Sequence, residues 1–150
     1  MARYCTQGDL ERALGGAAVL VQLLDKDQDG LPDPDAVNDV LDAGTSEIAS
    51  YIQRKISLDA IVQPYPLTLV FKTSDVCAFH AWARGSERQA APPNVAASYD
   101  AAIRWAINVG DGIATIGEVV KATLDPPAKL IDHDPNAIGM SIAGFKRGFR

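Results

Sequence analysis

Apolar residues recur at three- and four-residue spacings along most of the first 110 residues, which predicts helices rather than strands. The clearest stripe predicts a helix from about residue 34 to 56. Charged residues of this segment, such as Asp39 and Glu47, lie off the stripe, as expected for a helix with one buried face. The stripe comprises Val37, Val40, Leu41, Gly44, Ile48, Tyr51 and Ile52.

A short helix is predicted near the start of the chain. Thr6 can cap it, with Asp9 three residues later, a pairing that is typical of a helix start. Gly15 and Gly16 interrupt this helix, and a short apolar stretch, residues 17–24, then leads into an acidic loop.

Two further helices are predicted after a connector that is rich in proline. Pro66 can open the first of them, which ends near Gly85 by a glycine stop. The second carries Val95 and Tyr99 in register and closes near Gly110. The pattern therefore predicts an all-α protein, a small helical bundle of about four helices.

The helical pattern weakens beyond about residue 117. Prolines and glycines break up residues 118–150, yet this segment is too apolar to be a free, solvated tail. We therefore predict two parts, a helical domain over residues 1–117 and an extended C-terminal docking arm over residues 118–150.

The segment of residues 24–41 places a calcium-type loop directly before a helix start. Asp25, Asp27 and Asp29 occupy positions 1, 3 and 5 of an EF-hand-like loop, and Gly30 occupies position 6, where the chain must turn sharply. The backbone carbonyl of Leu31 can add a further oxygen ligand. This spacing indicates a hard cation such as Ca²⁺.

The acidic residues after this glycine have two interpretations. Asp33 can be a further ligand, and Asp35 or Asp39 can replace the bidentate Glu that an EF-hand needs at position 12, which here is Ala36. Alternatively, Asp33 is the N-cap, Pro34 the first helical residue and Asp35 a partner of the helix dipole. A structural Ca²⁺ is thus compatible with the loop, but no cofactor is required.

Composition and charge limit the functions that fit. The chain has 150 residues, a net charge of −5 and a sequence pI of about 4.9, which argues against nonspecific nucleic-acid binding by the body. Acidic residues crowd the first 60 positions, whereas the last five include Lys146, Arg147 and Arg150. No stretch resembles a signal peptide or a membrane span, so we expect a soluble, intracellular protein without a membrane partner.

No motif of a common catalytic class occurs in the sequence. GxSxG, Walker A, GxGxxG and HExxH are all missing. We interpret His80 as a packed or partly exposed helix residue and Tyr99 as a core or subunit-contact residue. Cys5 and Cys77 lack metal-ligand or CxxC spacing and make no disulfide framework, and Cys77 is expected to be a small core residue. We therefore expect no enzymatic activity.

Five segments follow one another in a recognisable order: TQGDLERALG, LLDKDQDGLPD, AVNDVLDAGTSEIASYIQRKISL, PLTLVFKTSDVCAFHAWAR and YDAAIRWAINVGDG. This order resembles the Mu-like bacteriophage head–tail connector family, whose members are head-completion or adaptor proteins. The resemblance covers about residue 4 to 117, with a weaker echo at residues 143–145.

Members of this family typically have an alanine-rich helix with a Tyr near its end. An Arg-aromatic-x-Leu-Pro segment comes directly after this helix. In this chain the corresponding positions are Tyr51, Lys55, Ile56, Leu58 and Asp59. Lys55 keeps the positive charge, whereas Ile56 replaces the aromatic residue and Asp59 replaces the proline. The overall fold assignment stands, but the detail of the turn differs.

The resemblance implies a structural adaptor that forms a homo-oligomeric ring, usually of twelve subunits, under the portal protein. Such a ring joins the DNA-filled head to the tail and continues the DNA channel without sequence-specific binding. A downstream neck, stopper or tail-terminator protein would be the next partner. The implied location is the neck of the virion, after assembly in the host cytoplasm.

The arm is expected to dock on the portal, because aromatic and arginine anchors are typical of buried docking segments. Two alternatives stay open. One is a calcium-dependent helical binding module that uses the Asp25–Asp35 loop, and the other is a helical regulator or immunity-type protein that binds one partner. The expected docking residues are Met140, Ile142, Phe145, Lys146, Arg147, Phe149 and Arg150.

Overall fold

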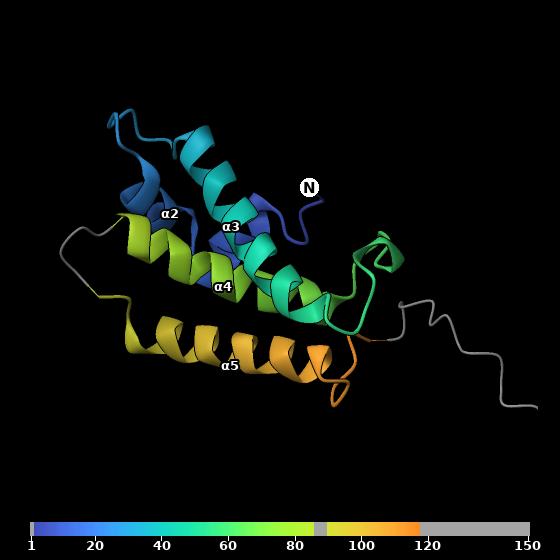
Figure 1. The fold of residues 1–150 in the computed structure, drawn as a ribbon. Helices are drawn as coiled ribbons and strands as arrows, with labels where there is room; N and C mark the ends of the chain where they lie inside the picture. The colour runs from blue at the N-terminus through green and yellow to red at the C-terminus, as the bar shows by residue number, and fades with distance from the viewer. Residues whose placement is uncertain (1, 86–89, 118–150) are drawn as a thin grey trace, which may run out of the picture.

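A computed structural model describes residues 2–85 and 90–117, and in these ranges the chain is helical and contains no strand (Figure 1). The all-α prediction is therefore confirmed. None of the helices in the described ranges is long and apolar enough to cross a membrane. The elements are α1 (Gln7–Leu14), α2 (Ala17–Leu24), α3 (Pro34–Ile52), the 3-10 turn η1 (Leu58–Ala60), α4 (Leu67–Gly85) and α5 (Pro93–Gly110).

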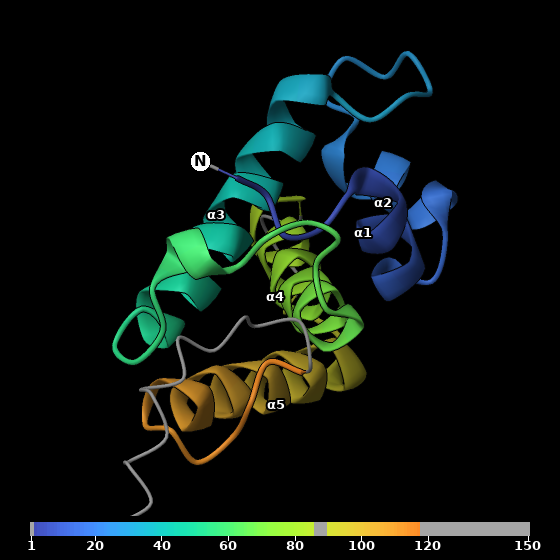
Figure 2. The ribbon, with the colours of Figure 1, turned by 90° about the vertical axis from the view of Figure 1, so that its right-hand side faces the viewer.

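Helix α4 is the centre of the bundle. It packs against each of the other four α-helices. Figure 2 shows α3, α5 and the α1–α2 pair arranged around it. Because α4 has neighbours on several sides, its buried residues surround the helix instead of forming one stripe; they are Leu69, Thr73, Ser74, Val76, Cys77, Ala78 and Ala81.

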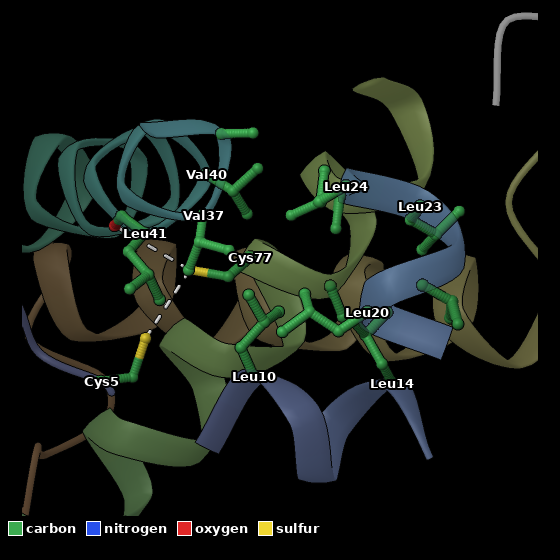
Figure 3. Packing of buried hydrophobic residues seen from close by; sticks show 14 residues of the cluster. Cys5, Leu10, Leu14, Leu20, Leu23, Leu24, Val37, Val40, Leu41 and Cys77 are labelled. Carbon is green, nitrogen blue, oxygen red and sulfur yellow. Dashed lines mark hydrogen bonds between the residues drawn. The ribbon is translucent and has the colours of Figure 1, made fainter. Parts of the chain in front are cut away.

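Two clusters of buried apolar residues form the core. The first joins α1 and α2 to the N-terminal half of α3 and the C-terminal half of α4 (Figure 3). The second joins the end of α3 to α4 and α5. Each fully buried Leu or Ile contributes about 1.5–3 kcal/mol, and those with almost no exposure are Leu10, Leu20, Leu24, Ile48, Ile52, Leu69 and Ile116.

The apolar stretch at residues 17–24 forms helix α2, so the body has five α-helices where about four were predicted. Gly15 ends α1 in the left-handed conformation, with φ of 91°. Its N–H donates to the Arg12 carbonyl, and the N–H of Gly16 donates to the Glu11 carbonyl at 2.8 Å. This glycine pair turns the chain between two helices of eight residues, a length too short to give a clear stripe.

The two predicted helix caps behave differently. At α1, the Thr6 N–H donates to Asp9 Oδ2 at 2.9 Å and the Asp9 N–H donates to Thr6 Oγ1 at 3.3 Å, which confirms the cap. The hydrogen bond from the Thr6 backbone holds the pKa of Asp9 below its usual range. Asp33 is the N-cap residue of α3, and its carbonyl accepts the Val37 N–H at 3.0 Å, so the interpretation of Asp33 as the N-cap is confirmed. Its side chain makes no capping hydrogen bond; the carboxylate accepts the Lys26 N–H at 3.1 Å instead.

Helix α3 ends at Ile52, four residues before the predicted end at residue 56. The Arg54 N–H donates to the Tyr51 carbonyl, a bond that tightens the last turn. Residues 53–55 are all exposed, so they offer no apolar side chain to continue the buried stripe. Ile56 packs on the second core cluster from the turn that follows.

The body has two distinct ends (Figure 1). The acidic loop between α2 and α3 lies at one end, beside the end of α4. Residues 53–66, the start of α4 and residues 109–117 lie at the other, which we call the exit end because the chain continues from there to residue 118. A Cβ placed on Gly117 would lie 3.5 Å from Cβ of Pro66, and Gly112 lies beside Lys55 in the same way.

Candidate functional site

The three acidic residues that were predicted as calcium ligands lie together in the loop between α2 and α3. Asp25, Asp27 and Asp29 each offer a carboxylate oxygen within 4.8 Å of the other two. Asp25 accepts the N–H groups of Asp29 at 3.2 Å and Gly30 at 3.0 Å, and Asp29 accepts that of Leu31 at 2.8 Å. Backbone N–H groups therefore hold the carboxylates on one side of the loop.

The remaining predicted ligands lie apart from this acidic triad. The carboxylates of Asp33 and Asp35 are not part of the group. Asp33 closes the loop on Lys26, and Asp35 stands in the first turn of α3. The Leu31 side chain is 65% exposed. Three of the six predicted ligand residues thus lie together, and the assignment of the other three as ligands remains a prediction.

The electrostatics of the triad suit a hard cation. The hydrogen bond from the Asp29 N–H lowers the pKa of Asp27, but partial desolvation and the charges of Asp29 and Asp33 outweigh it, so this pKa is raised. Mutual repulsion among carboxylates is what a bound cation would relieve. An all-oxygen donor set fits Ca²⁺, although a bound ion would share oxygens that already accept backbone N–H groups.

A mixed-charge surface adjoins the acidic loop. Arg84, near the end of α4, donates to Asp39 on α3 at 2.6 Å. A hollow of about 310 Å³ beside this pair is lined by Lys26, Asp33 and Asp35, among others. Arg84 is therefore already paired with an acidic side chain, and this surface alone identifies no ligand.

A hydrogen-bonded cluster that the sequence did not reveal connects three helices. Glu47 on α3 accepts the Tyr99 hydroxyl of α5 through Oε1 at 2.7 Å. Its Oε2 lies 2.7 Å from Nε2 of His80 on α4. Phe79 stacks on the Tyr99 ring with centroids 4.2 Å apart. His80 is a packed, partly exposed helix residue, as interpreted from the sequence, and the cluster aligns three helices with one another.

The Tyr99–Glu47 hydrogen bond predicts a loss of stability at high pH. This bond, together with desolvation and the Glu47 charge, raises the pKa of Tyr99 to about 12. The ordinary tyrosine pKa is about 10. A raised folded-state pKa contributes stability below the unfolded pKa, and the contribution is lost as pH rises towards 12.

We therefore expect the free energy of unfolding to fall between pH 10 and 12 in denaturant titrations, and Tyr99→Phe to remove part of that fall. At pH 8 this substitution should cost about 1 kcal/mol, the usual value of one hydrogen bond. Tyr4→Phe is the comparison variant: burial also raises the Tyr4 pKa, so this substitution should remove a separate part of the fall without touching the Tyr99–Glu47 hydrogen bond. Equal slopes for the parent protein and Tyr99→Phe would contradict the assignment.

Large apolar side chains are exposed at the exit end. Leu67 and Phe71, one turn apart on α4, are 70% and 46% exposed, and Val62 lies just before them. Ile113, just after α5, is 77% exposed. Grouped apolar exposure of this kind marks surfaces that contact other proteins.

Residues 4–130 match the family model described as "Bacteriophage Mu, Gp36". The chain belongs to the bacteriophage Mu Gp36 family. This match covers most of the chain and extends beyond the resemblance at residues 4–117. No curated protein matches the sequence. Membership identifies a phage protein, and the described part of this family member is an all-helical body.

The segment in which this Gp36 family member departs from the expected pattern lies at the exit end. Arg54 stands over the Tyr51 ring, 5.6 Å from its centroid. A Cβ on Gly110 would lie 2.3 Å from the Tyr51 carbonyl oxygen, so the end of α5 packs directly on the end of α3. Lys55 and Ile56 line a mainly apolar hollow of about 310 Å³ together with Val109, Gly112 and residues 114–117. The altered turn therefore adjoins the last residues that the structure describes before the predicted arm.

The predicted docking arm, residues 118–150, lies outside the described residues. It includes the seven expected portal-binding residues, Met140, Ile142, Phe145, Lys146, Arg147, Phe149 and Arg150. The Gp36 family match ends at residue 130, so these seven positions also lie beyond the matched range. Their assignment remains a prediction from the sequence.

Proposed function

We propose that this protein is a structural head–tail connector, an adaptor without enzymatic activity that forms a ring under the portal. In this role it joins the DNA-filled head to the tail and continues the DNA channel. Its partners would be other copies of itself, the portal and the next protein of the neck. The observation that carries the proposal is the match of residues 4–130 to a bacteriophage Mu family.

The exit end supports a body-to-body contact between neighbouring copies. A closed ring needs a contact in which one patch of each subunit meets a different patch of the next. The arm is assigned to the portal, so the apolar residues of the body remain for the ring itself. Leu67 and Phe71 are the candidates, because both are exposed and no charged residue stands between them on that face.

The charge of the chain supports a channel role. With a net charge of −5, the protein as a whole repels the phosphates of DNA. A wall that does not bind phosphate lets DNA slide through. The basic residues at the end of the sequence, Lys146, Arg147 and Arg150, would then serve protein contact rather than DNA binding.

Native mass spectrometry of the full chain, alone and with its cognate portal ring, tests the proposal. We expect a discrete complex with about as many copies as the portal has subunits. A stable monomer or dimer that does not bind the portal would refute the proposal and favour the helical regulator or immunity-type protein that binds one partner. Retained calcium on an unassociated monomer would favour the calcium module.

A matched pair of variants tests the ring contact. Leu67→Glu places a charge on the exposed first residue of α4, where an acid suits the helix dipole and leaves folding intact. We expect complexes with fewer copies per portal, because loss of a central contact costs about 2 kcal/mol. Ala101→Glu adds the same charge to an exposed position of α5 and should assemble normally. Equal copy numbers for both variants would reject the contact.

A calcium-dependent module is the second candidate function, favoured by the three carboxylates of the acidic triad. If Ca²⁺ binds there, a concentration 100 times the Kd should stabilise the fold by about 2.7 kcal/mol. Thermal unfolding with Ca²⁺ and with EDTA measures this. Asp27→Asn should abolish the effect, whereas the control Asp100→Asn, an exposed acid on α5, should keep it. Identical melting temperatures in both buffers would eliminate the calcium module.

A further inference from the structure

Two buried thiols that are distant in sequence meet in the first core cluster. Cys5 precedes α1 and Cys77 lies in the middle of α4, 72 residues later. Their Sγ atoms are 3.7 Å apart, and the two residues are 4% and 0% exposed (Figure 3). Both are free cysteines. Figure 3 shows the side chain of Cys5 directed at that of Cys77, with no other labelled residue between the sulfur atoms.

The two cysteines differ in freedom of movement. Cys77 is held between α3 and α4, because a Cβ on Gly44 would lie only 2.4 Å from its Sγ. Cys5 belongs to the irregular segment before α1, which begins at Gln7. A disulfide needs sulfur atoms about 2.0 Å apart, and a small shift of the segment that carries Cys5 can supply the difference.

The two cysteines also differ in access. Cys5 lines an open hollow of about 630 Å³ between the N-terminal segment and α3, whose wall includes Arg3, Thr6 and Asp42. Cys77 does not line this hollow. A small oxidant that enters it therefore meets Cys5 first and reaches Cys77 only through Cys5.

We propose that Cys5 and Cys77 form a redox-active dithiol that a small disulfide, such as oxidised glutathione, converts to an intramolecular disulfide. The Cys5 thiolate attacks glutathione disulfide, which yields a mixed disulfide on Cys5 and one reduced glutathione. Cys77 then attacks the Cys5 sulfur, its proton passes to the departing glutathione thiolate, and a second reduced glutathione leaves. Two thiols are oxidised and one glutathione disulfide is reduced.

The second step is the slow one. In the reduced protein, the hydrogen bond with Cys5, followed by burial, raises the pKa of the Cys77 thiol. The hydrogen bond of the Cys5 thiol is lost once Cys5 carries glutathione, but Cys77 lies in the core with no exposed surface, and this burial still raises its pKa. The thiolate is the attacking species, so closure of the disulfide at neutral pH takes longer than the first exchange. Raising the pH should therefore speed closure.

The disulfide would join the N-terminal segment to the central helix. It closes a loop of more than 70 residues, and chain-entropy arguments for such a loop predict a rise in Tm on the order of 10 °C. Cytosolic thiols stay reduced, whereas disulfides persist outside the cell. A virion component would pass from one form to the other on release. That last step rests on the proposed function, but the chemistry of the thiol pair does not.

The test uses the purified full chain, incubated with oxidised glutathione or with dithiothreitol and then alkylated. Peptide mapping without reduction should find the Cys5 and Cys77 peptides joined, with the loss of two hydrogen atoms, in a chain that remains monomeric on a non-reducing gel. The melting temperature should rise, and dithiothreitol should reverse the rise.

The matched variant is Cys5→Ser, which leaves the buried Cys77 in the core. It should fold like the parent protein and show no rise in Tm with oxidised glutathione. The proposal is overturned if both thiols of the parent protein still alkylate after prolonged oxidation. A persistent glutathione adduct on Cys5 alone, or a disulfide between two chains, overturns it as well. None of these results depends on whether the protein binds a portal.

Discussion

A chain that lacks residues 137–150 should fold normally and fail to bind the portal ring. Every residue of the two core clusters lies between Tyr4 and Ile116, so the deletion removes nothing from the described core. The removed segment carries Phe145, Phe149 and three basic residues, a combination suited to burial against a partner. The truncated chain should therefore lose its binding to the portal ring. Its melting temperature should stay within about 2 °C of that of the full chain, since surface changes alter stability little.

Circular dichroism and portal co-sedimentation measure the two halves of this prediction. Phe145→Ala with Phe149→Ala removes the apolar anchors, and Lys146→Ala with Arg147→Ala removes two charges. The first pair should weaken portal binding by at least 30-fold, on the order of 2 kcal/mol, and the second should act mainly at low salt. Normal portal binding by the truncated chain would move the docking site to the helical body.

Helix α3 was predictable because its apolar stripe is a local pattern in the sequence, whereas the buried residues of α4 surround that helix. In α3, the predicted inward positions Val37, Val40, Leu41 and Ile48 are all buried. Helix ends depend on other contacts. The end of α5 packs on the Tyr51 carbonyl at the end of α3. No pattern in the sequence near Ile52 predicts this contact, so the end of α3 was not predictable.

The candidate metal site was predictable where it depends on local sequence spacing and not where it depends on how the loop folds. The triad of Asp25, Asp27 and Asp29 follows from a local spacing, and the structure brings these three residues together. The sequence left Asp33 open as a further ligand or as the N-cap residue of the helix. It occupies the N-cap position, and its carboxylate accepts the Lys26 N–H, a hydrogen bond that depends on how the loop folds back.

The polar and thiol contacts between helices were not predictable. Glu47 meets His80 and Tyr99 across 33 and 52 residues, and Cys5 meets Cys77 across 72. Each pairing depends on how α4 packs against the neighbouring helices. The apolar periodicity of the sequence predicts the helices but not this packing. Glu47 lies off the apolar stripe of α3, and its position in the sequence does not indicate either partner.

Gly44→Ala should be destabilising although it replaces glycine in the middle of a helix. Helix propensity alone favours alanine by about 1 kcal/mol. The new Cβ, however, would lie 2.4 Å from Cys77 Sγ, and 3.1 and 3.2 Å from the Cys77 backbone N and Cα. The backbone of α4 cannot yield without moving the whole helix, so the overpacking cost is at the upper end of about 1–3 kcal/mol. The net loss should be about 1–2 kcal/mol.

Gly8→Ala is the matched control. Gly8 is exposed in α1, and its nearest contact for a new Cβ is Thr6 Oγ1 at 3.8 Å, so alanine should be neutral or slightly stabilising. Denaturant unfolding of both variants measures the difference. Similar free energies of unfolding would mean that α3 and α4 do not approach as closely as the structure places them.

A double-mutant cycle identifies the atom responsible. Cys77→Ala removes Sγ, the nearest atom to the new methyl group, and leaves the two backbone contacts in place. If the sulfur causes most of the strain, Gly44→Ala should cost less in a Cys77→Ala background, with a coupling energy of about 1 kcal/mol. If the backbone of α4 causes it, the two effects should add. Gly44 thus determines how closely α3 and α4 pack. Because Cys77 lies on α4, this packing distance also sets where Cys77 lies relative to Cys5.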